Sequence, residues 1–339
     1  MVRNVILSVV TLSVLFCVRI ESRSQAFTDL SIKERSLFEE LQNLTIKLAP
    51  TLWPDWPKEF PPFLLRTDTQ ELLVGHPNPS GDFSPFYSQT LGRRLWSRAT
   101  TDTSDVQASY PISGVKTAIM STPSQSENPY VWVLKAAHEV FHCYQGSTRI
   151  RDPFVGKFVS YHDLSFPFPY SDSALAAALR LEAEVVFRLA TAEASDKSSL
   201  FVQSRLLPFT WRVQQRLSSE REFQDYKILT EWSEGVARYT ERELARLAGT
   251  PGRYEPTSSF AQLFPGSSYG SVWREQYADA TMINPIRFVG EGVRGRVMFY
   301  FLGMGKAYAL DRINPEWRAA YRKTTLDDLL DQGTAQLSR

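Results

Sequence analysis

The pentapeptide His138-Glu139-Val140-Phe141-His142 constrains this chain more than any other segment. It has the form H-E-x-x-H, and the residues around it favour a helix. Two histidines four residues apart face the same side of a helix, one turn from each other. Two imidazoles placed in this way can bind one zinc ion, and the intervening glutamate lies close to the open coordination position. The motif therefore predicts a zinc hydrolase site, with His138 and His142 as metal ligands and Glu139 as the general base.

The residues that flank the motif indicate where its helix begins and ends. Asn128 suits an N-cap, Pro129 suits the first helical position, and Gly146 suits the residue just past the end. Apolar residues recur at helical spacing and would bury one face of the helix. The alternative is a surface helix on which both histidines are merely solvated.

The segment before this helix, residues 115–120, is rich in β-forming residues and predicts a strand. Next to a metal-binding helix, such a strand could bind an extended peptide by edge pairing. It could equally be an ordinary strand inside a sheet.

Length and charge are typical of one globular protein. The chain has 339 residues and a net charge of +1, with both signs of charge mixed along it. This charge balance gives no electrostatic reason to expect a nucleic-acid partner.

The N-terminus has the pattern of an export signal. Arg3 precedes the apolar segment Val5–Val18, which is too short to span a bilayer comfortably, and Ser24 and Ala26 suit a cleavage site. We therefore predict a signal peptide over residues 1–26, a secreted or periplasmic location, and no membrane span after cleavage. An uncleaved anchor and a lipoprotein modified at Cys17 are the alternatives.

The rest of the chain predicts an α+β protein. A β-rich part covers about 50–120, and a mostly helical part covers about 129–339, with the H-E-x-x-H helix at the junction. The aromatic-rich loop 150–171 could line a cleft or pack as filler. The expected strands are 62–66, 71–75, 92–97 and 115–120; the expected helices are 29–48, 172–194, 219–248, 291–311 and 325–337; and 50–61 is expected to be irregular.

Catalytic zinc usually has three protein ligands, and neither His76 nor His162 follows the motif at a suitable spacing. A glutamate from a later helix is more plausible. Glu234 and Glu182 are the candidates. Glu182 could instead accept a proton from a ligating imidazole, as could Glu231.

Glu234 lies in the segment Glu231-Trp-Ser-Glu-Gly-Val-Ala-Arg-Tyr239, and this segment together with H-E-x-x-H resembles the gluzincin metallopeptidases. The resemblance implies a zincin-like fold for residues 27–339, a Zn²⁺ cofactor bound by His138, His142 and Glu234, and Glu139 as the catalytic base. Gly235 would permit a close approach of two helices. The gap of 91 residues from His142 to Glu234 is longer than in thermolysin-like enzymes, and no G-x-M-E-N segment is present.

The function predicted from these residues is hydrolysis of peptide bonds in a peptide or protein substrate. Tyr239, Tyr300 and His162 are candidates for the donor that stabilises the oxyanion. Three alternatives remain open from the sequence. Glu234 could form an ion pair with Arg238 on a solvated face, the protein could be an inactive zincin-like binding protein, or it could hydrolyse a non-peptide substrate.

Overall fold

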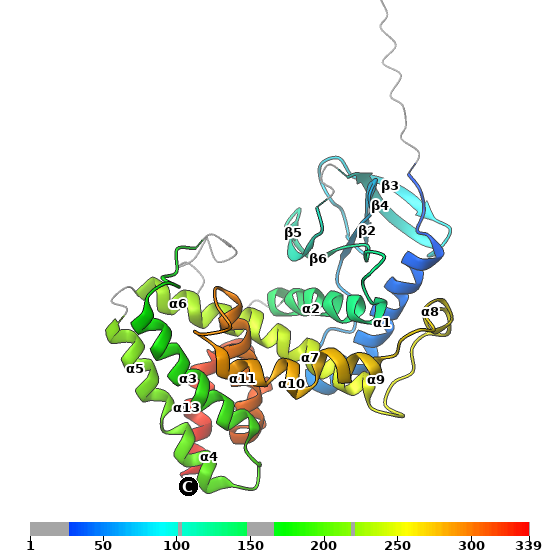
Figure 1. Ribbon diagram of the computed structural model, residues 1–339. Coiled ribbons are helices and arrows are strands. Elements are labelled where there is room, and N and C mark those ends of the chain that lie inside the picture. The colour runs from blue at the N-terminus through cyan, green and yellow to red at the C-terminus, as the bar shows by residue number, and fades with distance from the viewer. Residues whose placement is uncertain (1–26, 101–103, 148–165, 218–220, 339) are drawn as a thin grey trace, which may run out of the picture.

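The computed structural model describes residues 27–100, 104–147, 166–217 and 221–338. A six-stranded sheet near the N-terminus is followed by a mostly helical part (Figure 1), which confirms the predicted α+β class. The predicted signal peptide, His162 and most of the aromatic loop lie outside the described residues. Within those residues, no helix is long and apolar enough to span a bilayer.

The sheet contains all four predicted strands and two more. Its order is β3-β4-β2-β1-β6-β5, with β1 and β6 parallel and the other neighbours antiparallel. The two unpredicted strands, β3 and β5, lie at the edges, where exposed and Pro-containing sequence is tolerated. The strands are β1 (Phe63–Arg66), β2 (Gln70–Val74), β3 (Ser84–Ser88), β4 (Arg93–Ala99), β5 (Gln107–Ile112) and β6 (Val115–Ser121).

The position of β6 corrects one prediction. This strand pairs with β1 on one side and β5 on the other, so it is an interior strand and offers no free edge. Edge pairing through residues 115–120 is therefore wrong. The exposed edge next to β6 belongs to β5.

Alternate residues of the sheet face two different apolar clusters. Phe63, Leu65 and Met120 contact the main core, whereas Leu64 and Ile119 belong to a small cluster on the opposite face. This period of two is the expected result of strand geometry. The main core continues from the sheet through the helices of the rest of the chain.

The helical part agrees with the predictions for its long helices and adds several short ones. Helix α11 begins six residues later than predicted, and α1 continues to Leu52, so the segment expected to be irregular begins later. The helices of at least eight residues are α1 (Ile32–Leu52), α2 (Pro129–Ser147), α3 (Ser173–Thr191), α4 (Lys197–Ser204), α5 (Leu207–Leu217), α6 (Arg221–Thr230), α7 (Val236–Gly249), α11 (Val297–Ile313) and α13 (Leu326–Leu337). The short helices are α8 (Ser258–Leu263), α9 (Tyr269–Val272), α10 (Asp279–Met282), α12 (Trp317–Ala320), the π-helices η1 (Glu231–Gly235) and η2 (Trp273–Tyr277), and the 3₁₀-helices η3 (Asn284–Phe288) and η4 (Tyr321–Lys323).

Helix α2, which carries the H-E-x-x-H motif, runs beneath the sheet and above α7 (Figure 1). The side-chain oxygen of Asn128 accepts a hydrogen bond of 2.9 Å from the N–H of Tyr130, in agreement with the predicted N-cap. The helix continues past Gly146 to Ser147. Its apolar residues Val133, Ala137 and Val140 are at most 1% exposed, so the helix is central to the core.

The predicted helix 219–248 is a helix with a π-helical segment in its middle. Helix α6 leads into η1, and η1 leads into α7. The close approach expected at Gly235 is present. A Cβ on Gly235 would lie 2.4 Å from the Cα of Gly303 in α11, so the two backbones touch directly.

Candidate metal centre

Helices α2 and η1 bring the three predicted metal ligands together. The Nε2 atoms of His138 and His142 lie 3.5 Å and 3.4 Å from the same oxygen, Oε2 of Glu234. One potential ligand atom from each of the three residues lies within 4.8 Å of the other two. The three residues, called the triad below, therefore converge although 91 residues separate His142 from Glu234.

A buried carboxylate on α7 orients the first histidine. Nδ1 of His138 lies 3.0 Å from Oε2 of Glu241, which is 1% exposed. Arg238 and Tyr277 also donate hydrogen bonds to this carboxylate. In the neutral imidazole with its Nδ1 proton directed at Glu241, the lone pair is on Nε2, the atom that faces Glu234 and that would bind a metal ion.

The second histidine is oriented by a side chain of its own helix. Nδ1 of His142 lies 2.6 Å from Oε1 of Gln145. The amide nitrogen of Gln145 in turn donates to the carbonyl of Ser233 at 2.9 Å and to the hydroxyl of Tyr321 at 2.6 Å. Gln145 therefore ties the histidine helix to η1, the segment that carries Glu234.

Charges around the triad favour ionised carboxylates. Burial favours the neutral form of Glu234, but His142 and His138 hold the pKa of its carboxyl well below the usual range. Burial likewise disfavours ionised Glu241, yet Arg238 and His138 lower its pKa to about 2. Burial alone would lower the pKa of His138, but hydrogen bonds to Glu234 and Glu241 raise it from 6.5 to about 10. The two carboxylates thus create a site for positive charge, whether a proton or a metal ion.

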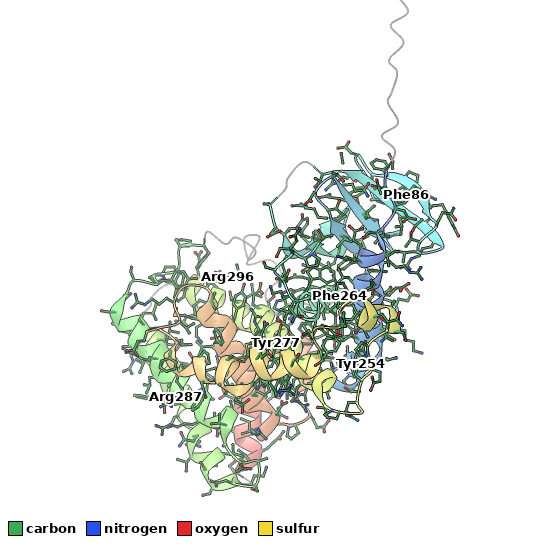
Figure 2. The ribbon with its side chains drawn as sticks, turned by 45° about the vertical axis from the view of Figure 1, so that its right-hand side comes forward. Phe86, Tyr254, Phe264, Tyr277, Arg287 and Arg296 are labelled. Carbon is green, nitrogen blue, oxygen red and sulfur yellow. The ribbon has the colours of Figure 1, made fainter. Side chains whose placement is uncertain are left out.

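The ion pair predicted as an alternative role for Glu234 is wrong. Arg238 pairs with Glu241, at 3.0 Å, rather than with Glu234. The other oxygen of Glu234, Oε1, instead pairs with Nη2 of Arg296 at 3.1 Å. Arg296 directly precedes α11, at the upper end of that helix in Figure 2.

Glu182 and Glu231 do not take part in the triad, which corrects both of their predicted roles. Glu182 is fully buried among donors from other helices, Trp211, Gln214, Lys227 and Lys306. Glu231 pairs with the same two lysines, and Asp327 pairs with Lys306. These five charged residues, three carboxylates and two lysines, form a buried ion cluster. Its ammonium groups already neutralise carboxylates that could otherwise attract a metal ion.

The triad opens into a cavity of about 500 Å³. Glu139 is 4% exposed and lines this cavity beside both histidines. One wall is formed by the edge strand β5. The lining residues are Gln107, Ala108, Ser109, Tyr110, His138, Glu139, His142, Ser233, Glu234, Arg238, Arg296 and Tyr300.

Of the two predicted oxyanion donors that the structure describes, Tyr300 lies at the cavity. Tyr239 is fully buried elsewhere, and its hydroxyl donates to Asp311 at 2.9 Å, so its predicted role is wrong. His162 lies outside the described residues. His76 is not part of the triad, and its Nε2 lies 2.9 Å from the carbonyl oxygen of Ile112.

The described end of the aromatic loop packs into the core. Phe166 stacks on Tyr226, and Phe168 contacts Phe299 edge-on. Cys143, next to His142 on α2, is 2% exposed and packs as a small buried residue. These contacts favour the packing role for residues 166–171.

The donor set of the triad fits a zinc ion. Two imidazole nitrogens and one carboxylate oxygen are common zinc ligands, and three protein ligands leave one position free for water or substrate. The hydrogen bonds at both Nδ1 atoms complete the pattern expected around ligating histidines. Comparisons of the chain with family models, curated proteins and solved structures gave no match in any of the three.

Proposed function

We propose that this protein is a zinc-dependent peptidase of the gluzincin type with a zincin-like arrangement of sheet and metal-binding helix. The observation that carries the proposal is the convergence of His138, His142 and Glu234, because it joins two motifs that are far apart in the chain. Glu139 lies on the same helix and lines the same cavity. A site that only stabilised the fold would have no use for this carboxylate beside an open position.

The proposed reaction assigns a proton-transfer role to Glu139. A bound zinc ion would supply Lewis acidity and would make a water molecule easier to deprotonate. Glu139 takes a proton from the attacking water and later delivers it to the leaving amine. No described residue donates a hydrogen bond to its carboxylate, so the described residues leave its oxygens available for this transfer.

Two other features of the cavity support a peptide substrate. Within the described part of the chain, strand β5 pairs with β6 alone, and its residues Gln107–Tyr110 line the cavity. Its free edge can align an extended peptide across the triad by backbone hydrogen bonds. Tyr300, on the opposite helical side, is the predicted donor that remains available to stabilise the oxyanion.

Export is part of the proposal and rests on the sequence of residues 1–26. The site would then act outside the cytoplasm. N-terminal sequencing of the protein recovered from the producing cells should begin at Phe27, and a chain that retains Met1 in the cytoplasm would contradict export.

Zinc content and peptide cleavage test the catalytic proposal. Wild-type protein should bind one zinc ion and cleave members of a mixed peptide library. Glu139→Gln should keep the zinc and lose at least about a hundredfold in kcat, since general acid–base catalysis contributes about 10²–10⁴. Glu127→Gln is a matched control, because Glu127 pairs with Lys135 outside the triad.

Two outcomes would separate the proposal from its rivals. Bound zinc without cleavage of any peptide by the wild type would favour a binding protein or a hydrolase of another substrate class. Retention of zinc by Glu234→Ala would contradict the assignment of the third ligand.

A further inference from the structure

The cavity wall carries two arginines beside the two glutamates of the proposed zinc site. Its charged residues are Glu139, Glu234, Arg238 and Arg296. Both glutamates have roles in the proposed zinc site, and a zinc ion would add two positive charges. The loaded cavity would therefore be cationic and would attract an anionic group.

Arg296 has N–H donors that no described residue uses. Its Nη2 binds Glu234, but Nε and Nη1 are buried and have no hydrogen-bond partner among the described residues. Buried polar groups normally have a partner, and an unpaired charged donor is costly. Since Arg296 lines the cavity, a ligand in the cavity can supply the missing acceptor.

Arg238 differs from Arg296 in this respect. Its Nη1 lies 3.0 Å from both oxygens of Glu241 and therefore supports the partner of His138. Arg296 is thus the better candidate for direct contact with a ligand, because the carboxylate of Glu241 already neutralises Arg238.

The position of Arg296 relates the ligand to the reacting bond. Arg296 contacts Glu234, and Glu234 contacts both histidines, at distances of 3.1 to 3.5 Å. One residue of an extended peptide spans about 3.3–3.6 Å. A group bound at Arg296 would therefore lie about one or two residues from a peptide bond held at the triad.

We propose that the cavity selects peptides with a carboxylate within about two residues of the cleaved bond, and that Arg296 binds this carboxylate through its free N–H groups. The selection of cleavage sites rests on the peptidase function proposed above. The carboxylate is either the C-terminal α-carboxylate or the side chain of Asp or Glu. Guanidinium donors match a carboxylate better than they match a neutral amide.

Binding experiments test this inference without relying on catalysis. The protein is zinc-loaded Glu139→Gln, and the probes are N-acetylated hexapeptides of neutral residues, measured by calorimetry. One probe ends in a free carboxylate, one in an amide, and two amidated probes carry a central Glu or Gln. The probe with the recognised carboxylate should bind about 10- to 100-fold more tightly than its amide counterpart. The C-terminal and central pairs separate the two sources of carboxylate.

Arg296→Lys provides the decisive variant. It keeps a positive charge beside Glu234 but removes the two unpartnered donors, so most of the preference should disappear. Arg294→Lys is the matched control, because Arg294 is exposed, lies two residues away and does not line the cavity. It should keep the full preference. Zinc content is measured for both variants.

Equal binding of the carboxylate and amide probes, or an unchanged preference in Arg296→Lys, would overturn the inference. A second measurement needs no variant: mass spectrometry of a library digested by the wild type should place cleavage sites within two residues of a carboxylate. Cleavage without regard to carboxylates would overturn the inference while supporting the peptidase function. A carboxylate preference in binding with no cleavage of any peptide would support the inference about Arg296 and contradict the peptidase function.

Discussion

Replacing Glu241 with glutamine tests whether a buried carboxylate strengthens the metal site through His138. Glu241 has no direct place in the triad, but its Oε2 lies 3.0 Å from Nδ1 of His138. Glutamine has nearly the same shape, and its carbonyl oxygen can still accept the Nδ1 proton. The variant therefore removes the negative charge while it keeps the orientation of the imidazole.

The expected loss follows from the environment of this hydrogen bond. The Glu241 carboxylate is 1% exposed, so solvent does not screen its interaction with the imidazole. Hydrogen bonds to charged groups contribute about 1.5–3 kcal/mol, and carboxylate partners of ligating histidines change metal affinity about 10- to 100-fold. We expect the zinc dissociation constant of Glu241→Gln to rise by about 10- to 100-fold.

Chelator competition at fixed pH and ionic strength measures this constant. Glu243→Gln is the control, since Glu243 lies on the same helix and is 6% exposed, but it binds Tyr308 and Arg246 instead. The control should bind zinc within about threefold of the wild type. Equal zinc affinity of the Glu241 and Glu243 variants would refute the role assigned to Glu241.

Three further predictions concern the fold around the site. Gly303→Ala should lower the free energy of unfolding, measured in urea, by about 1–3 kcal/mol or more, because its Cβ would lie 2.2 Å from the backbone oxygen of Glu231. Gly146→Ala is the control, since the nearest atom to its Cβ would lie at an ordinary contact distance of 3.5 Å. An equal loss of stability in the two variants would contradict the reasoning. Lys306→Met should cost about 3–5 kcal/mol in the same assay by leaving buried carboxylates unpaired, and a loss below about 1 kcal/mol would contradict this. In metal-free protein, the pKa of His138 is raised from 6.5 to about 10, so protonated His138 contributes its full stabilisation below about pH 6.5 and loses it as the pH rises through about 10. The difference in urea midpoint between the wild type and His138→Gln should therefore shrink over this pH range. A difference that stays constant would contradict the prediction.

The sequence predicted the parts of the site that depend on local spacing. His138 and His142 share a face because α2 is a regular helix, and Gly235 permits the contact with α11 because it has no side chain. The resemblance to a known segment also predicted Glu234 as the third ligand, and its carboxylate oxygen lies beside both histidines. These features depend on a few neighbouring residues, and local rules describe them well.

The residues that contact the triad or line its cavity from other segments were harder to predict. Glu241 lies seven residues after Glu234, two helical turns along, and this spacing was an available signal that it shares a face with the ligand. Arg296 gave no comparable signal, since its contact with Glu234 depends on how α11 crosses η1. The edge strand β5 was missed because it contains Pro111, which is tolerated only where a strand has a free edge.

The π-helical turn explains why Glu231 does not contact the histidines, although it lies only three residues before Glu234. A π-helix takes more residues per turn than an α-helix, so residues three apart are rotated further from each other. Glu231 therefore faces Lys227 and Lys306, while Glu234 faces the two histidines. The same short segment is held on one side by the buried ion cluster and at Gly235 by the backbone of α11. Glu234 is thus positioned by contacts that do not involve the metal site, which allows a ligand so distant in sequence to meet the histidines in a fixed geometry.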